Sequence, residues 1–178
     1  GMTPEKETWA LLMGVHLAMR QRLAVVKRLT PLGLAVWGSE DWKQVAGIDY
    51  RGLADWETRL ASVFNASGVN VNASKTMFPS GLAPRVLEVL ASGGFLLSSR
   101  NPVLERFFAD GEDLVFYDSL DDLESKARAW LARPEDRRRI GRLGMAKVRS
   151  LHTWTPRAWR ILEVLVQSGA LPARTLGL

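Results

Sequence analysis

The sequence predicts a doubly wound parallel α/β fold with helical segments at both ends. Two observations support this prediction. Short apolar runs that resemble strands recur along the chain, and helix-forming segments alternate with them. Strands that are apolar throughout indicate a parallel sheet with helices on both faces. The length of 178 residues suits one such domain and is short for two.

A leading helix is expected over 2–30, because its apolar side chains recur at helical spacing and two glutamates open the segment. The apolar residues in question are Trp9, Leu12, Met13, Leu17 and Leu23. The run 30–33 (TPLG) ends the helix. His16 falls on its apolar side, so a packed histidine is expected there.

Two short strands are expected next, at 34–37 and 48–50, and both adjoin glycines. Asp55 can then cap a helix that stops at Gly68. The apolar stripe of this helix is Trp56, Leu60, Val63 and Phe64. The β-branched run 69–73 suits an inner strand of the sheet.

Pro84 is placed for the first turn of a helix over 85–92. Strands at 95–98 and 114–117 are almost wholly apolar, with a brief helix at 103–108 between them. Because ligands of such sheets bind beyond the carboxyl ends of the strands, the loops that follow the strands are the places to seek a site.

Three further helices complete the chain. Ser119 is placed to cap the first, and Pro134 and Pro156 open the other two. Most of the tryptophans fall on apolar stripes, so core packing is expected for them. We interpret 1–178 as a single domain, with the leading helix at 2–30, the core at 33–150 and a helical tail at 151–178.

Composition excludes several classes of protein. There is no cysteine, and only two histidines are present, so neither a disulfide framework nor a multi-histidine metal site is expected. The net charge is +5, but the arginines concentrated at 133–142 have no aromatic residues among them, which favours a solvated helix over a nucleic-acid surface. No apolar run reaches the roughly 20 residues of a membrane span, and the start lacks a basic signal segment, so a cytoplasmic protein is expected.

The stretch 69–99 is the most informative, because it combines strand, loop, helix and strand. Free backbone N–H groups at the helix start near Pro84 form a site suited to a diphosphate, and Gly81 lets the backbone approach phosphate oxygens. Arg85 adds a charged contact. Glu88 projects from nearly the same face and can accept hydrogen bonds from both hydroxyls of a ribose. Together these positions suit a nucleotide diphosphate.

An ordered set of motifs also resembles a known family, the carboxyl-terminal donor-binding domain of GT-B glycosyltransferases. The resemblance is greatest to the bacterial "glycosyl transferases group 1" and its spore-maturation glycosyltransferase-like branch. It covers about 34–165. The motifs are 50–52 (YRG), 65–67 (NAS), 69–72 (VNVN), 85–88 (RVLE), 91–97 (ASGGFLL), 111–117 (GEDLVFY), 131–137 (LARPEDR) and 152–154 (HTW).

The resemblance implies a Rossmann-like core that binds a nucleotide diphosphate sugar and requires no metal or other cofactor. It implies that Glu88 holds the ribose of the donor. The diphosphate would lie near Ser80, Gly81 and Leu82, and the donor would also contact the residues after the first strand, Ser39 and Glu40.

Two departures from the family pattern bear on activity. Many members carry a second glutamate eight positions before the one that matches Glu88, and Ser80 stands there in this chain. No catalytic residue is therefore assigned. The segment before Leu34 is too short for the amino-terminal acceptor-binding domain that the family needs, so we expect a partner domain or chain to supply it and expect no turnover without it.

Other functions remain open at this point. The main alternative is a non-catalytic nucleotide-binding or protein-interaction module on the same fold. A phosphoreceiver is disfavoured because the expected third strand ends in Ala73 and Ser74 rather than in aspartate, and a dinucleotide dehydrogenase because no G-x-G-x-x-G motif follows a strand.

Overall fold

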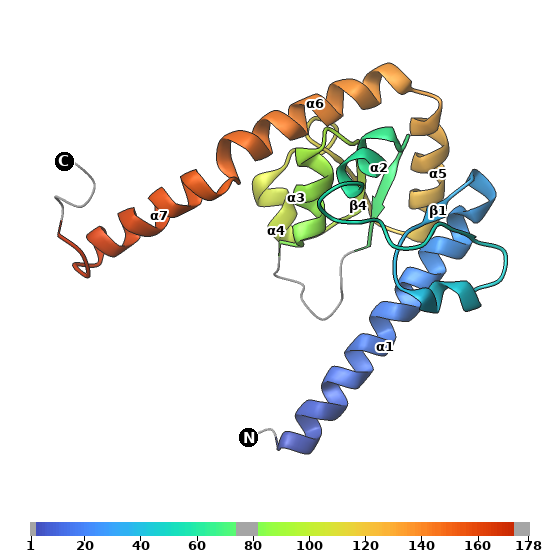
Figure 1. Ribbon diagram of the computed structural model, residues 1–178, viewed down its shortest axis with the longest axis horizontal. Helices are drawn as coiled ribbons and strands as arrows, with labels where there is room; N and C mark the ends of the chain where they lie inside the picture. The colour runs from blue at the N-terminus through green and yellow to red at the C-terminus, as the bar shows by residue number, and fades with distance from the viewer. Residues whose placement is uncertain (1–2, 74–81, 173–178) are drawn as a thin grey trace.

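The computed structural model describes residues 3–73 and 82–172 (Figure 1). The strands are β1 (Ala35–Val36), β2 (Asp49–Tyr50), β3 (Asn70–Asn72), β4 (Leu96–Ser99) and β5 (Val115–Tyr117). The α-helices are α1 (Pro4–Leu29), α2 (Leu60–Ala66), α3 (Pro84–Ala91), α4 (Pro102–Phe107), α5 (Leu120–Leu131), α6 (Pro134–Leu151) and α7 (Trp154–Gln167). Two short 3-10 helices are η1 (Thr30–Leu32) and η2 (Glu40–Gln44).

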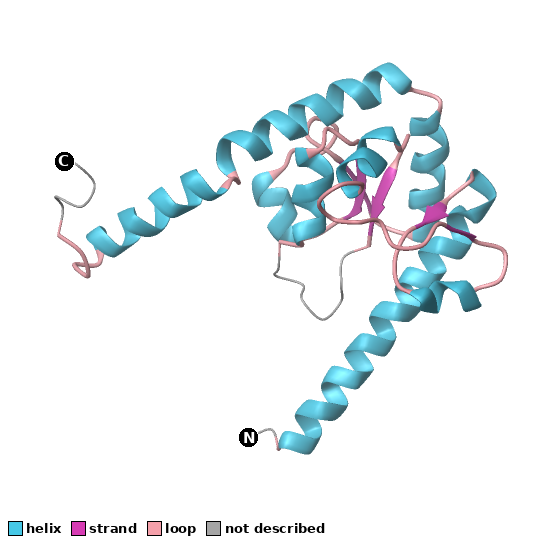
Figure 2. Cartoon of the chain, viewed as in Figure 1, coloured by secondary structure: helices cyan, strands magenta, loops and turns pink. Residues whose placement is uncertain are grey.

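The centre of the molecule is a parallel sheet in the order β3-β4-β5 (Figure 2). Its register pairs Asn70 with Leu96 and Leu97 with Val115. Successive residues of a strand point to opposite faces, so the apolar runs of β4 and β5 supply side chains to both sides of the sheet. This is why Leu96 and Leu97 of β4 and all of β5 are consecutive apolar residues rather than alternating with polar ones.

Each face of this sheet is covered by its own core. α1, α5 and α6 cover one face, and that core is formed by Val25, Leu29, Phe95, Leu97, Val115, Tyr117, Leu123, Ala127 and Ile140. α3, α4 and α6 cover the other face, and that core is formed by Val86, Val89, Leu90, Leu96, Leu104, Phe108, Leu114, Phe116 and Val148. The doubly wound α/β fold class predicted from the sequence is therefore confirmed.

β1 and β2 form a second, two-stranded parallel sheet. Its register pairs Ala35 with Asp49 and Val36 with Tyr50. Within the described part of the chain, no backbone ladder joins β1 to β3. The sequence predicted the strands but not this division into two sheets, and the division leaves a groove between them.

Helix α6 packs closely because two of its residues are glycines. A Cβ added at Gly141 would lie 2.4 Å from the carbonyl oxygen of Gly93, and one at Gly144 would lie 2.4 Å from that of Asp113. One turn further on, Lys147 Nζ is 2.5 Å from Oδ2 of the buried Asp113. These contacts fix α6 against the loops that precede β4 and β5.

The two end helices extend away from this body (Figure 1). The buried residues of α1 are Ala18, Val25, Val26 and Leu29. None of the residues described in its first half is buried. α7 has no buried residue within its described length. Within residues 3–73 and 82–172, no helix combines the length and the apolar character needed to cross a membrane.

Several local predictions are wrong, for identifiable reasons. The helix expected after Asp55 begins only at Leu60, because the Asp55 carboxylate caps a separate turn by accepting from the backbone N–H of Thr58 at 2.8 Å. His16 is exposed rather than packed, because α1 projects past the body there. The prediction of core packing is also wrong for four tryptophans, because no described element packs over them. These are Trp9, Trp56, Trp154 and Trp159.

Other local predictions are confirmed. The hydroxyl of Ser119 caps α5 by accepting from the backbone N–H of Asp122 at 3.1 Å. Pro84 and Pro134 stand in the first turns of α3 and α6. A contact that these predictions did not cover is made by His152, which packs against two rings with centroid distances of 5.3 Å to Phe107 and 5.6 Å to Phe108.

Candidate functional site

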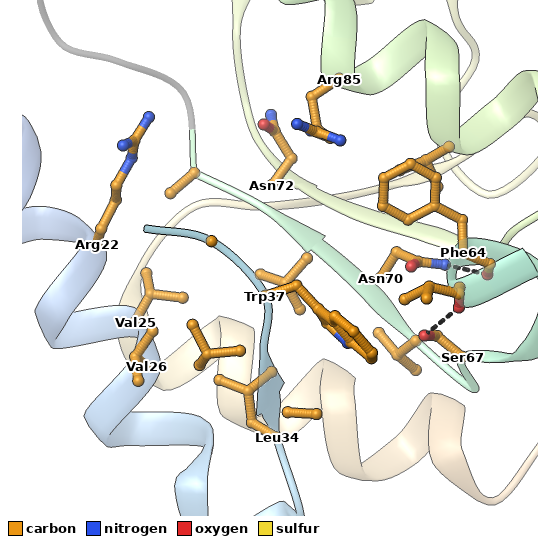
Figure 3. Close-up of a pocket in the computed structure, with 18 of the residues that line it drawn as sticks. Arg22, Val25, Val26, Leu34, Trp37, Phe64, Ser67, Asn70, Asn72 and Arg85 are labelled. Carbon is orange, nitrogen blue, oxygen red and sulfur yellow. Dashed lines mark hydrogen bonds between the residues drawn. The ribbon is translucent and has the colours of Figure 1, made fainter. Parts of the chain in front are cut away.

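A large groove lies between the two sheets (Figure 3). Its volume is about 1130 Å³, which is ample for a nucleotide-sized ligand. α1 and β1 form one wall, and β3, α2 and the start of α3 form the other. The lining is largely apolar, with Val25, Val26, Leu34 and Trp37 prominent in the view.

The carboxyl edge of the three-stranded sheet is held together by buried polar contacts. The side-chain amide of Asn72, at the end of β3, donates to Ser98 Oγ at 2.9 Å. The hydroxyl of Tyr117 donates to the carbonyl oxygen of Asn72 at 3.1 Å, and burial raises the pKa of Tyr117 to about 12. The phenol therefore keeps its proton at neutral pH, and the strand ends form a fixed floor for this end of the groove.

The first turn of α3 is open to an anion. Ala83 precedes the helix and offers no side-chain cap, and Pro84 takes the first helical position. Pro84 has no N–H, and the N–H of Val86 donates to the carbonyl oxygen of Ala83 at 3.0 Å, so among the described residues of this turn the N–H of Arg85 is the one left open. An open N–H at a helix start, with the helix dipole behind it, attracts negative charge.

Arg85 and Glu88 stand together on the same wall. Arg85 Nη1 is 3.0 Å from Glu88 Oε2, and the guanidinium also lies over the ring of Phe64, 5.4 Å from its centroid. The contact is an ion pair within helix α3. Glu88 Oε2 is shielded from solvent, and among the described residues it receives no hydrogen bond. This carboxylate oxygen therefore has an unused capacity to accept one.

The groove carries a small net positive charge. Among the described residues that line it, the charged side chains are Arg22, Arg85 and Glu88. Two guanidinium groups against one carboxylate leave an excess of one positive charge, so the electrostatics favour an anionic ligand. No group of three or more His, Asp or Glu residues suitable for a metal ion occurs in 3–73 and 82–172.

The structure brings together part of the site expected from the sequence. Leu82, Arg85, Glu88 and Ser39 all line the groove. Glu40 does not: its carboxylate is 2.6 Å from Lys43 Nζ on the exposed surface of η2. The remaining expected residues, Ser80 and Gly81, lie outside the described residues.

Sequence reasoning did not anticipate three lining residues. Arg22 lies on the leading helix, which was expected only to flank the core. Asn72 could have been suspected, because an asparagine within a β-branched run is unusual at a buried position. Trp37 ends the first strand run, and its ring faces the groove (Figure 3).

The fold and this groove define an α/β domain that presents a ligand-sized cavity beside the carboxyl ends of parallel strands. The chain belongs to the glycosyl transferase-like family, whose model matches residues 19–163. The match is to the family as a whole, so the spore-maturation branch stays a prediction.

A solved structure supports the same fold. The chain is similar to sucrose-phosphate synthase from Thermosynechococcus elongatus, with a TM-score of 0.65 and 18% sequence identity. The similarity covers 85% of this chain and 43% of that one, so this chain spans less than half the length of the solved protein. At this identity the likeness shows the fold alone, which is of the GT-B type. No curated protein sequence matches the chain.

Proposed function

We propose that this chain is the donor-binding domain of a glycosyltransferase, which takes a sugar from a nucleotide diphosphate and passes it to an acceptor. The observation that carries the proposal is the Glu88 carboxylate. It lines a large groove, and its shielded oxygen Oε2 pairs with Arg85 at 3.0 Å but receives no hydrogen bond among the described residues, close to the start of α3.

Each of these groups has a role that suits one part of the donor. The open N–H of Arg85 at the start of α3 and the Arg85 guanidinium would bind the diphosphate, so that no metal is needed for binding. The Glu88 carboxylate would accept hydrogen bonds from the ribose hydroxyls. In the transfer itself, protein groups that stabilise the diphosphate would assist its departure from the sugar. Ser80 and Gly81 would add contacts to the diphosphate. Within the family, we propose that the chain belongs to the spore-maturation glycosyltransferase-like branch.

We also propose that the chain does not turn over alone and needs an acceptor-binding domain or partner. This rests on the exposed apolar side chains of both end helices and on the solved relative, of which the similarity covers only 43%. The same exposed side chains favour a second candidate, an interaction module that has kept the fold without the chemistry.

Calorimetric titration with UDP, GDP, TDP, ADP and their common sugar conjugates tests the proposal. We expect saturable binding of one nucleotide, weakened at least about tenfold in Glu88→Ala, since a charged hydrogen bond is lost. Glu163→Ala is the matched control, because Glu163 pairs with Arg160 three residues away at 2.9 Å, as Glu88 does with Arg85, but lies outside the groove. This variant should bind as the wild type does.

Two outcomes would contradict the proposal. Equal affinity in Glu88→Ala and the wild type would remove Glu88 from the site. Absence of binding of every nucleotide at millimolar concentration would favour the interaction module instead.

A further inference from the structure

The leading helix contributes a cation to the same groove. Arg22 of α1 lines the wall opposite α3. Figure 3 shows its guanidinium at the same end of the groove as Asn72 and Arg85, with the end of β3 between the two arginines in this view. No sequence pattern places a residue of the leading helix near α3, which begins about sixty positions later.

The second half of α1 is well anchored, so the position of Arg22 is fixed by packing. Val25 and Leu29 belong to the core that covers one face of the central sheet. Arg28 also forms ion pairs with Asp121 and Glu124 of α5. Arg22 lies one turn before this anchored segment, and its side chain extends from a rigid support.

The Arg22 guanidinium has no carboxylate partner within the described part of the chain. Arg100 provides a contrast, because it follows β4 at the carboxyl edge of the sheet but is fully engaged. Its guanidinium pairs with Glu105 at 2.7 Å, Asp110 at 3.2 Å and Asp118 at 2.6 Å. These carboxylates hold the pKa of Arg100 above its usual value and neutralise its charge.

We propose that Arg22 is a second phosphate-binding residue of this groove, so that Arg22 and Arg85 hold the two phosphoryl groups of a diphosphate from opposite walls. The inference rests on the proposed function and extends it, because it makes the leading helix part of the donor site. Planar guanidinium groups suit phosphate oxygens, which they bind through two parallel hydrogen bonds. A diphosphate also carries enough negative charge to use both cations.

The inference separates diphosphates from monophosphates. One arginine suffices to hold a single phosphoryl group, whereas the second arginine contributes only when a second phosphoryl group is present. Loss of Arg22 should therefore weaken diphosphate binding and leave monophosphate binding nearly unchanged. A merely structural role for Arg22 would not produce this difference.

The test is calorimetric titration of the full chain with inorganic pyrophosphate, inorganic phosphate and the nucleoside mono- and diphosphates of the same base. We expect Arg22→Gln to weaken pyrophosphate and nucleoside diphosphate binding about tenfold or more, and monophosphate binding less than twofold. Arg22→Lys should retain part of the affinity. Arg20→Gln is the matched control, because Arg20 lies on the same helix but lines a separate small groove beside Trp42. Thermal unfolding of each variant checks that it is folded.

The outcomes distinguish this inference from the proposed function. If nucleotide binding depends on Glu88 but not on Arg22, the proposed function stands and this inference is overturned. If pyrophosphate binds through Arg22 but no nucleotide binds in preference to it, the anion site stands and the proposed function fails. Equal losses in Arg22→Gln and Arg20→Gln, or no pyrophosphate binding by the wild type, would also overturn the inference.

Discussion

The central body and the two end helices place similar apolar side chains in opposite environments. Leu97 of β4 is fully buried, whereas Leu12 of α1 and Ile161 of α7 are more than half exposed. All three lie in regular secondary structure with apolar neighbours, so the local sequence does not show which of them is buried. Burial depends on what packs against an element: helices cover both faces of the central sheet, and no described element covers the outer halves of α1 and α7. The exposed side chains are therefore available for contacts outside this fold.

The largest expected effect contrasts these two regions directly. Leu97→Ala should lower the free energy of unfolding by about 2–5 kcal/mol, because it leaves a cavity in a core that cannot collapse around it. Leu12→Ala should change it by less than about 0.5 kcal/mol, since the side chain is already in water. Urea unfolding of both variants measures the difference. Equal destabilisation would show that the first half of α1 is covered in solution.

A second prediction concerns how closely α6 approaches the body. Gly141→Ala should lower the free energy of unfolding by about 2 kcal/mol, because the added methyl group meets the carbonyl oxygen of Gly93 and forces the helix outward. Arg142→Ala, at the next position of the same helix, is exposed and should stay within about 0.5 kcal/mol of the wild type. A stabilised Gly141→Ala variant would mean that the gain in helix propensity exceeds the clash, and that the contact is looser than described.

The smallest expected effect is a pH dependence at the junction of the body and α7. Burial against Phe107 and Phe108 lowers the pKa of His152 below its ordinary value of 6.5, and nearby Arg157 and Lys147 add to this. The unfolded chain then binds a proton more readily than the folded one. Stability should therefore be complete above about pH 6.5 and decline as the pH falls below it.

Unfolding by urea at pH 7.5 and pH 5.5 measures this slope. His152→Leu should show a smaller loss of stability at the lower pH than the wild type, whereas His16→Gln should match the wild type because His16 is exposed. An unchanged slope in His152→Leu would assign the pH dependence to other groups.

The sequence predicted individual elements better than their assembly. β3, β4 and β5 lie within a residue or two of their expected positions, because each apolar run is bounded by glycine or a polar residue. The cap at Ser119 and the proline that opens α3, Pro84, are also local features, and both are found. The helix start predicted at Asp55 was wrong because an aspartate side chain can cap a turn as well as a helix.

The candidate site was only partly predictable, because part of it depends on how the elements pack rather than on the local sequence. Arg85 and Glu88 are three residues apart on one helix, so their proximity follows from helical geometry, and their roles stay predictions. Arg22 enters the groove only because α1 packs on α5, and no spacing along the chain encodes that contact. An amphipathic stripe also shows that a helix has an apolar face without showing which surface covers it.

The division of the strands into two sheets has a consequence for how the molecule opens. β4 is paired on both sides and lies between two cores, so its backbone amides should exchange with solvent only when the whole domain unfolds. β1 and β2 pair only with each other within the described part of the chain, and only the chain leading into β1, through Leu34, packs against one of the two cores. We therefore expect the backbone amides of β1 and β2 to exchange more readily than those of β4, with the groove as the boundary between the two regions. A ligand that contacts residues of both walls would couple the two regions, and the amides of β1 and β2 would then exchange more slowly.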